Sequence, residues 1–392
     1  MDFGNTKVAF SDKTDGDLRM ARILFQTIQN PKIIRLGKKL LAFAMAIHLP
    51  ILWIVRLTVF KHFCGGRTIK ECKKQIETLK KSNIGTILDY SVESSDKTDA
   101  YNANTKEIIA TIESGSKEYG VPFAVFKLSA LASNSLMEKI GRNAALTEKE
   151  EGDLVRVKGR IDRICAKARE LEVPVLIDAE ESWLQVAIDL WAEEMMRKYN
   201  TGRAWVYTTV QLYRNDKLGY LQELFIKAKD DNFKLGLKLV RGAYMEKEHD
   251  RAERLGYDSP VFREKLSTDQ TFNKALEFCL DNLDWVYFVA GTHNEDSCKL
   301  LADEIKKRGL KRDDQRIYFS QLLGMSDHIS YNLANEGFNV AKYVPYGPVK
   351  KVMPYLIRRA EENTSVSGQT SRELQLITRE LKRRKEFRSR GN

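Results

Sequence analysis

The stretch "NFKLGLKLVRGAYMEKEHDRAERLG", residues 232–256, combines the two patterns that decide the fold. Its first nine residues alternate apolar side chains with basic or small ones, which is the period of two typical of a β-strand. From residue 245 onward the apolar spacing is helical instead. The stretch therefore predicts a strand, a turn and a helix, with Lys238 and Arg241 near the end of the strand, where sites are often built.

The same rhythm of an apolar run and a charged helical stretch recurs along the chain from residue 84. Eight apolar runs of strand length begin at Ile84, Val121, Val173, Ala204, Lys234, Trp285, Gln315 and Phe338. Strands that alternate with helices predict a parallel sheet, and eight units over about 250 residues or slightly more predict an α/β fold of the closed (β/α)8 type. We expect a helical N-terminal arm over residues 1–80, a barrel over 81–370 and a basic helical tail over 371–392.

The composition is that of a globular protein with a large core. The chain has 392 residues, of which 43% are hydrophobic, and only 8 prolines. The formal charge of +11 comes from 65 basic residues interleaved with 54 acidic ones, which is typical of solvated helix faces. The basic end "RELKRRKEFRSRGN" is expected to remain solvated. A membrane-surface or nucleic-acid-binding protein that uses this end is an alternative, but it leaves the polar strand ends unexplained, so no nucleic-acid partner is expected.

The cysteines and the N-terminal region indicate where the chain works. The five cysteines form no C-x-x-C pair and no metal-like spacing with the histidines, so we expect free thiols and no metal. No export signal is visible in the first 25 residues, which favours a cytoplasmic location. The segment "LLAFAMAIHLPILWIV", residues 40–55, is shorter than the roughly twenty apolar residues of a membrane span. Buried helices are the favoured interpretation, and a helix docked peripherally on the inner face of a respiratory membrane is the alternative.

Polar residues close most of the predicted strands, and in a (β/α)8 barrel such residues converge on one mouth. They are Lys127, Asp178, Glu180, Gln211, Lys238, Arg241, Tyr244, Thr292, His293, Asn294, Gln321, Tyr343 and Tyr346. So many hydrogen-bonding groups with two or three cations suit a large, polar, anionic ligand. The chain has neither a G-x-G-x-x-G nor a P-loop motif, and His293 alone is more often a hydrogen-bonding residue than a metal ligand.

Seven short motifs in register resemble one family. "FKLSAL", "LIDAEE", "KLVRGAYM", "GTHN", "QLLGMSD", "KYVPYGPV" and "YLIRRAEEN" are similar to the monofunctional FAD-dependent proline dehydrogenases, also called proline oxidases, over residues 80 to 370. The resemblance implies a (β/α)8 barrel that binds FAD at the strand ends. It also implies oxidation of L-proline to 1-pyrroline-5-carboxylate with a quinone as electron acceptor, the first step of proline catabolism. A separate pyrroline-5-carboxylate dehydrogenase would then take the next step.

The resemblance assigns roles around the flavin. Lys238, at a position where many bacterial members carry arginine, would place a positive charge beside the ring as it gains negative charge. The lysine ammonium replaces the planar guanidinium of arginine, so hydrogen bonding to the flavin could differ in detail. The other cofactor-binding positions are Ala179, Gln211, Arg241, Gly242, Ala243, Thr292, His293, Asn294 and Gln321.

The resemblance also assigns the substrate side. Arg358 and Arg359 would bind the proline carboxylate, because arginine offers two parallel donors, and Glu362 would hold them by a helix-spaced ion pair. Lys127 would be a further contact. Tyr244, Leu322 and Tyr343 would form the wall around the pyrrolidine ring, with Tyr343 leaving no room for the hydroxyl of 4-hydroxyproline.

Two alternatives stay open at the strand ends. Asp178 could orient Lys127 or Arg359 as part of the catalytic set, or simply cap the helix that follows it. A buried Lys127 could form a Schiff base, so an aldolase is the second enzyme hypothesis. A proline dehydrogenase-like enzyme acting on 4-hydroxyproline is a further alternative.

Overall fold

The structure is a computed structural model of the chain. It describes residues 1–30, 32, 37, 52–91, 98–117, 120–365 and 369–390, with side chains described up to residue 359 in the last helix of the barrel. Most of the apolar segment 40–55 lies outside these residues, so the two interpretations of it stay predictions. In the described part of the chain, no helix is both long and apolar enough to cross a membrane.

Eight parallel strands close into a barrel in the order in which they occur in the chain. They are β1 (Ile84–Tyr90), β2 (Phe123–Lys127), β3 (Val175–Asp178), β4 (Val206–Gln211), β5 (Leu235–Val240), β6 (Val286–Gly291), β7 (Ile317–Leu322) and β8 (Val340–Tyr346). Strand β8 pairs with β1 from Ile84 opposite Val340 to Tyr90 opposite Tyr346. Each strand falls inside one of the eight predicted runs, so the predicted (β/α)8 fold is confirmed.

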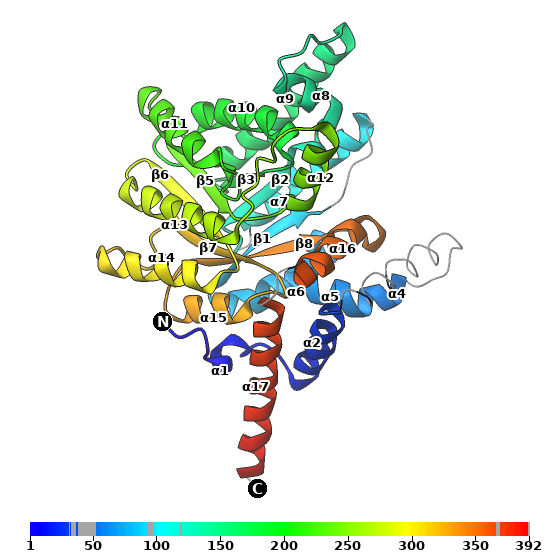
Figure 1. Ribbon diagram of the computed structural model, residues 1–392, viewed down its shortest axis with the longest axis vertical. Coiled ribbons are helices and arrows are strands. Elements are labelled where there is room, and N and C mark those ends of the chain that lie inside the picture. Colours follow the sequence, from blue (N-terminus) through cyan, green and yellow to red (C-terminus); the bar gives the residue numbers. More distant parts are fainter. Residues whose placement is uncertain are drawn as a thin grey trace.

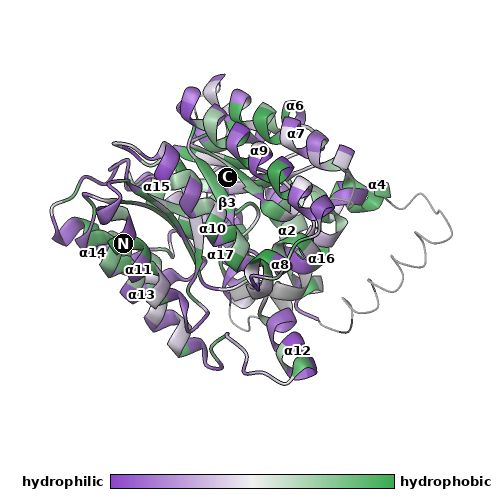
Figure 2. Cartoon of the chain, turned by 90° about the horizontal axis from the view of Figure 1, so that it is seen from above, coloured by the Kyte–Doolittle hydropathy of each residue, from purple (hydrophilic) through white to green (hydrophobic). Residues whose placement is uncertain are grey.

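Helices surround the barrel between successive strands (Figure 1). They are α6 (Ile69–Lys80), α7 (Thr98–Lys117), the 3-10 turn η2 (Leu128–Ala130), α8 (Asn134–Gly141), α9 (Glu148–Glu170), α10 (Ser182–Tyr199), α11 (Lys217–Asp230), α12 (Met245–Leu255), α13 (Lys265–Asp281), α14 (Glu295–Lys307), α15 (Asp327–Asn335) and α16 (Val349–Ser365). In Figure 2 the strands around β3 are mainly hydrophobic, whereas the surrounding helices mix hydrophobic and hydrophilic residues. This is the pattern of a sheet covered on its outer face by amphipathic helices.

Side chains of each strand alternate between two hydrophobic cores. The inner core fills the barrel and includes Tyr207, Val289 and Tyr343, whereas the outer core lies between the sheet and the helices and includes Leu237 and Leu239 of β5. Successive strand residues point to opposite faces of a sheet. Lys238, which stands between the two leucines of β5, therefore points into the barrel.

The N-terminal arm and the C-terminal helix pack together beside the barrel. The arm comprises α1 (Thr6–Ala9), α2 (Asp15–Ile28), α4 (Leu52–Val55), the π-helix η1 (Arg56–Phe60) and α5 (Lys61–Phe63), and the last helix is α17 (Gln369–Arg390). Figure 1 shows α17 in red extending away from the barrel beside α2. The domain limits that the sequence predicts are not decided by this arrangement and stay a prediction.

Helix α17 is anchored over much of its length and is not a solvated tail. Leu376 and Ile377 are buried in a cluster with Phe10 and Phe25 of the arm. Arg384 donates hydrogen bonds of 2.8 Å to the carbonyl oxygens of Phe10 and Lys13. The expectation that this basic end remains solvated is therefore wrong around Arg384, because the arm supplies the acceptors that bind its charge. All five cysteines are buried free thiols, as predicted.

Candidate active site

Three predicted site residues meet inside the barrel toward its mouth: Asp178 ends β3, Lys238 lies two residues before the end of β5, and Tyr343 lies in the middle of β8 rather than at its end. The Lys238 ammonium lies 2.5 Å from Asp178 Oδ1 and 3.1 Å from the Tyr343 hydroxyl, and that hydroxyl donates to Asp178 Oδ1 at 2.7 Å. The ammonium also lies 4.5 Å from the centroid of the Tyr343 ring. The aspartate, the lysine and the tyrosine form a closed triangle, which we call the axial cluster.

Burial determines the protonation of the tyrosine in the axial cluster. Burial raises the pKa of Tyr343 well above its ordinary value, and the negative charge of Asp178 raises that pKa further. The phenol therefore stays protonated and donates its hydrogen to the carboxylate. Asp178 binds Lys238, whose long side chain reaches it from two strands away. A role of Asp178 in orienting Lys127 or Arg359 stays a prediction.

Lys127 ends β2, next to Asp178 in the strand register, and is half-buried. It lies among acids. Burial raises the pKa of Asp89 on β1, with the Asp178 charge adding to the rise and the Lys127 charge opposing it. Burial likewise raises the pKa of Glu180, although Ser129 donates to its carboxylate and Lys127 lies near it. One side of the mouth therefore combines a lysine with several carboxyl groups.

Two buried glutamines end β4 and β7, and both already bind protein groups. Gln211 Nε2 donates to the Glu180 carbonyl at 2.7 Å and to the Tyr213 hydroxyl at 2.9 Å. Gln321 Nε2 donates to the Thr292 carbonyl at 3.0 Å, and Ser330 donates to Gln321 Oε1 at 2.8 Å. These bonds tie the ends of neighbouring strands and loops together.

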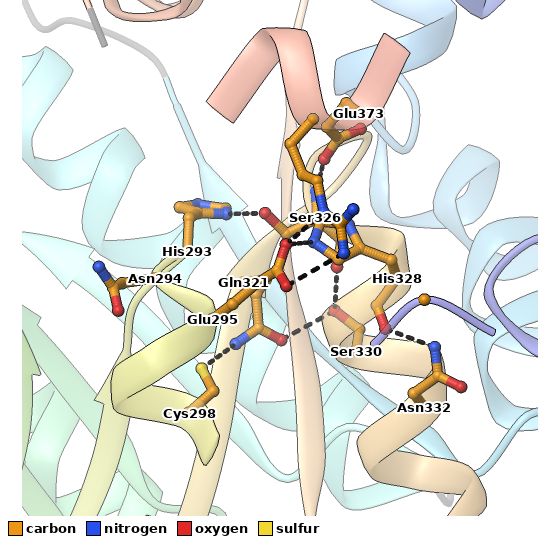
Figure 3. A network of polar contacts seen from close by, with 12 residues as sticks. His293, Asn294, Glu295, Cys298, Gln321, Ser326, His328, Ser330, Asn332 and Glu373 are labelled. Carbon is orange, nitrogen blue, oxygen red and sulfur yellow. Dashed lines mark hydrogen bonds and ion pairs between the residues drawn. The ribbon is translucent and has the colours of Figure 1, made fainter. Parts of the chain in front are cut away.

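The predicted cofactor residues after β6 lie in a polar network (Figure 3). Asn294 caps α14 by accepting a hydrogen bond from Ser297 N at 2.9 Å, while Thr292 Oγ1 accepts one from Asn294 N at 3.1 Å. His293 Nδ1 lies 2.9 Å from Ser326 Oγ. Burial lowers the pKa of His293 to about 3, and the nearby positive charges of Lys342 and Arg359 add to the effect. This imidazole is therefore neutral at physiological pH.

The segment that follows β5 contains a buried guanidinium. Arg241 lies 3.1 Å from Asp269 and stacks 4.6 Å from the Phe272 ring, yet its Nε, Nη1 and Nη2 atoms make no hydrogen bond to any residue that the structure describes. A buried donor without a hydrogen bond is costly, so a ligand that accepts from it would be favoured. Gly242 and Ala243 follow, and the half-buried Tyr244 precedes α12.

Helix α16 brings the two predicted arginines to the mouth. The charge of Arg358 acts on the hydroxyl of Tyr244, and that of Arg359 acts on His293. The Arg359 guanidinium lies 5.3 Å from the Tyr355 ring on the same helix. Leu322, at the end of β7, packs against both the inner core and the cluster formed by α16 and the arm. The side chain of Glu362 lies outside the described side chains, so its pairing with the arginines stays a prediction.

Three polar residues of this region were missed by sequence reasoning. Asp89 was missed although it nearly ends the first strand run, where the strand-end rule that found the others applies equally. Ser326 and Glu373 belong to the His293 network, in which the Glu373 carboxylate accepts from Ser326 N. No pattern in the sequence connects Glu373 to the barrel, because the contact depends on how α17 packs.

Comparison with known proteins identifies the family. Residues 72–372 match the sequence model of the family described as proline dehydrogenase. The mitochondrial proline dehydrogenase 1 of Dictyostelium discoideum is 32% identical over 411 residues, which cover 94% of this chain and 71% of the relative. The carbapenem antibiotics biosynthesis protein CarD of Pectobacterium carotovorum subsp. carotovorum is 35% identical over 322 residues, which cover 82% of this chain and 83% of the relative.

A solved structure has the same fold. The crystal structure of proline utilization A from Bdellovibrio bacteriovorus, inactivated by N-propargylglycine, matches with a TM-score of 0.72 and 18% identity, over 93% of this chain and 38% of that chain. The chain thus corresponds to less than half of that longer protein, and at this identity the likeness shows the fold alone. The family match and the curated relatives carry the assignment further: this chain belongs to the proline dehydrogenase family of oxidoreductases.

Proposed function

We propose that this protein is an FAD-dependent enzyme that oxidises L-proline to 1-pyrroline-5-carboxylate and passes the electrons to a quinone. The observation that carries the proposal is the axial cluster, in which a lysine ammonium is held at a fixed place in the barrel mouth by Asp178 and Tyr343. A fixed cation stabilises negative charge that develops beside it without having to reorganise during the reaction. The aldolase alternative is not favoured by the family match.

The residues present fit a flavin. Its ring, ribityl chain and phosphates would require donors spread over several strand ends, and the described mouth offers Lys238 and the β6 loop, whereas the side-chain amide of Gln211 would have to exchange its present partners, Glu180 and Tyr213, to bind the flavin. The buried Arg241 guanidinium, which has no hydrogen bond in the described part of the chain, adds a cation that an anionic ligand could satisfy. When bound, the flavin would supply the acceptor for a hydride from the substrate.

The substrate side requires a carboxylate site and an ordered ring. Arg358 and Arg359 of α16, with Lys127 across the mouth, would bind the carboxylate, since arginine pairs with two oxygens at once. Tyr343 and Tyr244 would pack beside the pyrrolidine ring and exclude water. Oxidation removes a hydride from a ring carbon and a proton from the ring nitrogen and leaves a carbon–nitrogen double bond, so the chain must orient the ring without reacting covalently.

A visible absorption spectrum of the purified protein tests the proposal. We expect flavin bands that bleach when L-proline is added anaerobically and return when a soluble quinone is added. A protein that is colourless and stays catalytically silent with added FAD would contradict the proposal. If borohydride trapped a carbonyl substrate on the protein, and Lys127→Met abolished the trapping, the aldolase function would replace it.

A quinone acceptor dissolves in the membrane, and the arm offers a surface that would dock there. Its exposed apolar side chains lie on α2, α4 and η1, and they are Met20, Ile23, Trp53, Ile54 and Leu57, exposed by 49%, 56%, 60%, 47% and 59%. Arg19 of α2, Arg56 of η1 and Lys61 of α5 are exposed basic residues of the same arm. Apolar side chains beside cations favour an anionic lipid surface, so we assign the enzyme a peripheral membrane contact at this face.

Sedimentation with lipid vesicles tests the membrane contact. We expect binding to vesicles that contain anionic phosphatidylglycerol and weaker binding to purely zwitterionic ones, with a blue shift of Trp53 fluorescence. The double variant Trp53→Ser and Leu57→Ser should lose binding. Val155→Ser is the matched control, because Val155 is 72% exposed on α9, away from the arm. Equal binding of both variants would remove the proposed face.

A further inference from the structure

The first turn of α17 holds two loops at the barrel mouth (Figure 3). The Glu373 carboxylate accepts a hydrogen bond from the backbone N–H of Ser326, which precedes α15. One residue earlier, Arg372 Nε donates to Glu295 Oε1 at 2.9 Å, and His328 Nε2 lies 3.0 Å from the same oxygen. A helix far along the chain therefore contacts residues next to the β6 loop.

Ser326 has an unusual backbone that requires outside support. Its φ is +52°, in the left-handed region, which a residue other than glycine rarely adopts and which costs of order 1–3 kcal/mol. Such a conformation persists only where surrounding contacts determine it, and Glu373 provides one such contact. The residue is fully buried, and its hydroxyl lies 2.9 Å from His293 Nδ1.

We propose that Glu373 is a positioning residue that orients His293 through Ser326, which makes α17 part of the cofactor site. The proposal rests on the proposed function in so far as His293 faces the flavin. The chain of contacts runs from a carboxylate on α17 to a backbone N–H, then from that residue's hydroxyl to the imidazole. It ends in the segment 292–294 that follows β6.

The consequence for His293 concerns which ring nitrogen carries hydrogen. A neutral imidazole has one N–H donor and one acceptor nitrogen. The contact between Nδ1 and the Ser326 hydroxyl holds the ring in one orientation, and the direction in which that hydroxyl points its hydrogen decides whether Nε2 offers a donor or an acceptor to a ligand. A displaced Ser326 hydroxyl would let both tautomers and other ring orientations form.

Burying the carboxyl group of Glu373 costs free energy, which argues that the side chain has a function at this place. Glu373 is 6% exposed, and burial raises its pKa to about 7. The neighbouring charges are of both signs: His328 and Lys342 oppose the rise and Asp327 adds to it. An apolar residue would pack there at lower cost but would leave the Ser326 N–H without its acceptor.

Three variants separate positioning from simple anchoring of the helix. Glu373→Ala removes the acceptor, and Glu373→Gln keeps an acceptor oxygen without the charge. Arg384→Gln is the matched control, because it removes bonds that hold the other end of α17 to the arm and touches no residue of the relay. The measurements are the dissociation constant of FAD from the apoprotein and the ¹⁵N chemical shifts of the histidine rings. Only five histidines are present, and His293→Gln identifies the relevant signal.

The expected pattern is specific. Glu373→Ala should raise the FAD dissociation constant about tenfold, the loss expected for one hydrogen bond to a charged or buried group, and shift the His293 signals toward a tautomer mixture. Glu373→Gln should stay within about twofold of wild type, as should Arg384→Gln even if its melting temperature falls. Wild-type FAD affinity in Glu373→Ala, or an equal loss in Arg384→Gln, would overturn the proposal.

The failure of the positioning role can be told from the failure of the proposed function. The ¹⁵N spectrum of the apoprotein reads the His293 tautomer without any flavin. If wild type bound no FAD, the proposed function would fail while the effect of Glu373→Ala on His293 could still be observed. If FAD bound normally but the His293 signals were identical in Glu373→Ala and wild type, only the positioning role would fail.

Discussion

Two strand lysines of the barrel, Lys238 of β5 and Lys342 of β8, each form a buried ion pair with an aspartate. Lys238 lies 2.5 Å from Asp178, and Lys342 lies 2.8 Å from Asp327. By residue type, burial and distance the two pairs are close equivalents. Their surroundings differ. The first pair contacts Tyr343 near the barrel mouth. In the second, Lys342 donates to the carbonyl of Met325, and Lys13 of the arm lies 3.7 Å from Asp327.

Strand geometry explains why equivalent pairs have different surroundings. Tyr343 lies in the inner core, and its neighbours along β8, Val344 and Val340, lie in the outer core. Lys342 therefore points outward to α15 and the arm, while Lys238 points inward. We infer that the outer pair joins the arm to the barrel and that the axial pair serves chemistry. Whether a strand lysine points into the barrel or out toward the helices, rather than the residue with which it pairs, therefore separates a candidate catalytic ion pair from a structural one.

The largest expected effect comes from removing each lysine in turn. Lys238→Met leaves the buried Asp178 without a cation and should destabilise the fold by about 3–5 kcal/mol, whereas Lys342→Met leaves Asp327 with Lys13 at 3.7 Å and should destabilise it less. Only Lys238→Met should also lower the rate of flavin reduction by proline, by about 100-fold or more, and make the flavin potential more negative. Stopped-flow reduction and a redox titration measure these two effects.

The outer pair is the matched control for that experiment. If Lys342→Met slowed flavin reduction as much as Lys238→Met did at equal stability, the division into structural and chemical pairs would be broken. An unchanged flavin potential in Lys238→Met would remove that lysine from the mechanism. The double variant Lys238→Met and Asp178→Asn should recover stability, because it removes the unpaired charge, but should not recover the rate.

A second test measures how the free energy of unfolding depends on pH. The group expected to respond is Glu373, which lies near Asp327 and Lys342 of the outer pair. Burial raises the pKa of Glu373 from 4.5 to about 7. Between these values the folded protein holds a proton that the unfolded chain has lost, so stability should fall as pH rises from about 4.5 to about 7 and then level off. The loss from this group is a few kcal/mol at most, since a difference of one in pKa corresponds to about 1.36 kcal/mol.

Urea unfolding of wild type and Glu373→Gln across this pH range gives the measurement. The glutamine cannot ionise, so wild type should lose unfolding free energy relative to Glu373→Gln as pH rises through the window. His328 and Asp327 of α15 and Lys342 of β8 lie near the carboxyl group and are the same in both proteins, so the comparison isolates the Glu373 carboxyl group to first order. A pH-independent difference would show that Glu373 does not titrate in this range.

The sequence predicts the barrel well because the signal is repeated. Eight apolar runs alternate with helices, so the same pattern occurs eight times. The position of Lys238 between Leu237 and Leu239 already indicates that it points to the opposite face of the strand from the two leucines. The helix α17 carries no such repetition. Its basic sequence is typical of a solvated surface, and only the arm, through the carbonyls of Phe10 and Lys13, turns Arg384 into an anchor.

The site was predictable where the strands build it and not where loops and distant helices do. Asp178, Lys238 and Tyr343 were found by strand position together with resemblance to a family, although the pairing of Asp178 with Lys238 was not anticipated. Pairing depends on side-chain reach across the barrel, which is a property of the closed sheet. Ser326 and Glu373 were missed because their contact joins segments 47 residues apart through packing alone.

The third prediction concerns the two arginines of α16 that would bind the substrate carboxylate. Arg358→Ala or Arg359→Ala should raise the apparent KM for proline about 10- to 100-fold, because a bound carboxylate loses charge-assisted hydrogen bonds worth about 1.5–3 kcal/mol. Prolinol, which lacks the carboxylate, should hardly distinguish these variants from wild type. Lys351→Ala is the control, since Lys351 is an exposed cation on the same helix. Equal losses with proline and prolinol would mean that the arginines serve the cofactor or the fold.

The smallest expected effect concerns Tyr343 and the choice between proline and 4-hydroxyproline. Tyr343 points inward and donates to Asp178, whereas Tyr346 of the same strand points outward and bonds to Thr111 and Glu107 of α7. Tyr343→Ser opens space for a hydroxyl and should raise the ratio of 4-hydroxyproline to proline turnover about tenfold, within the roughly hundredfold that a pocket discriminates against an added hydroxyl. Tyr343→Phe keeps the ring and loses only the bond to Asp178, so it should slow both substrates alike, and Tyr346→Phe should change neither ratio nor rate. Steady-state kcat/KM with both substrates decides the matter: if wild type oxidises both equally well, or Tyr343→Ser loses both in proportion, the inward tyrosine does not set specificity.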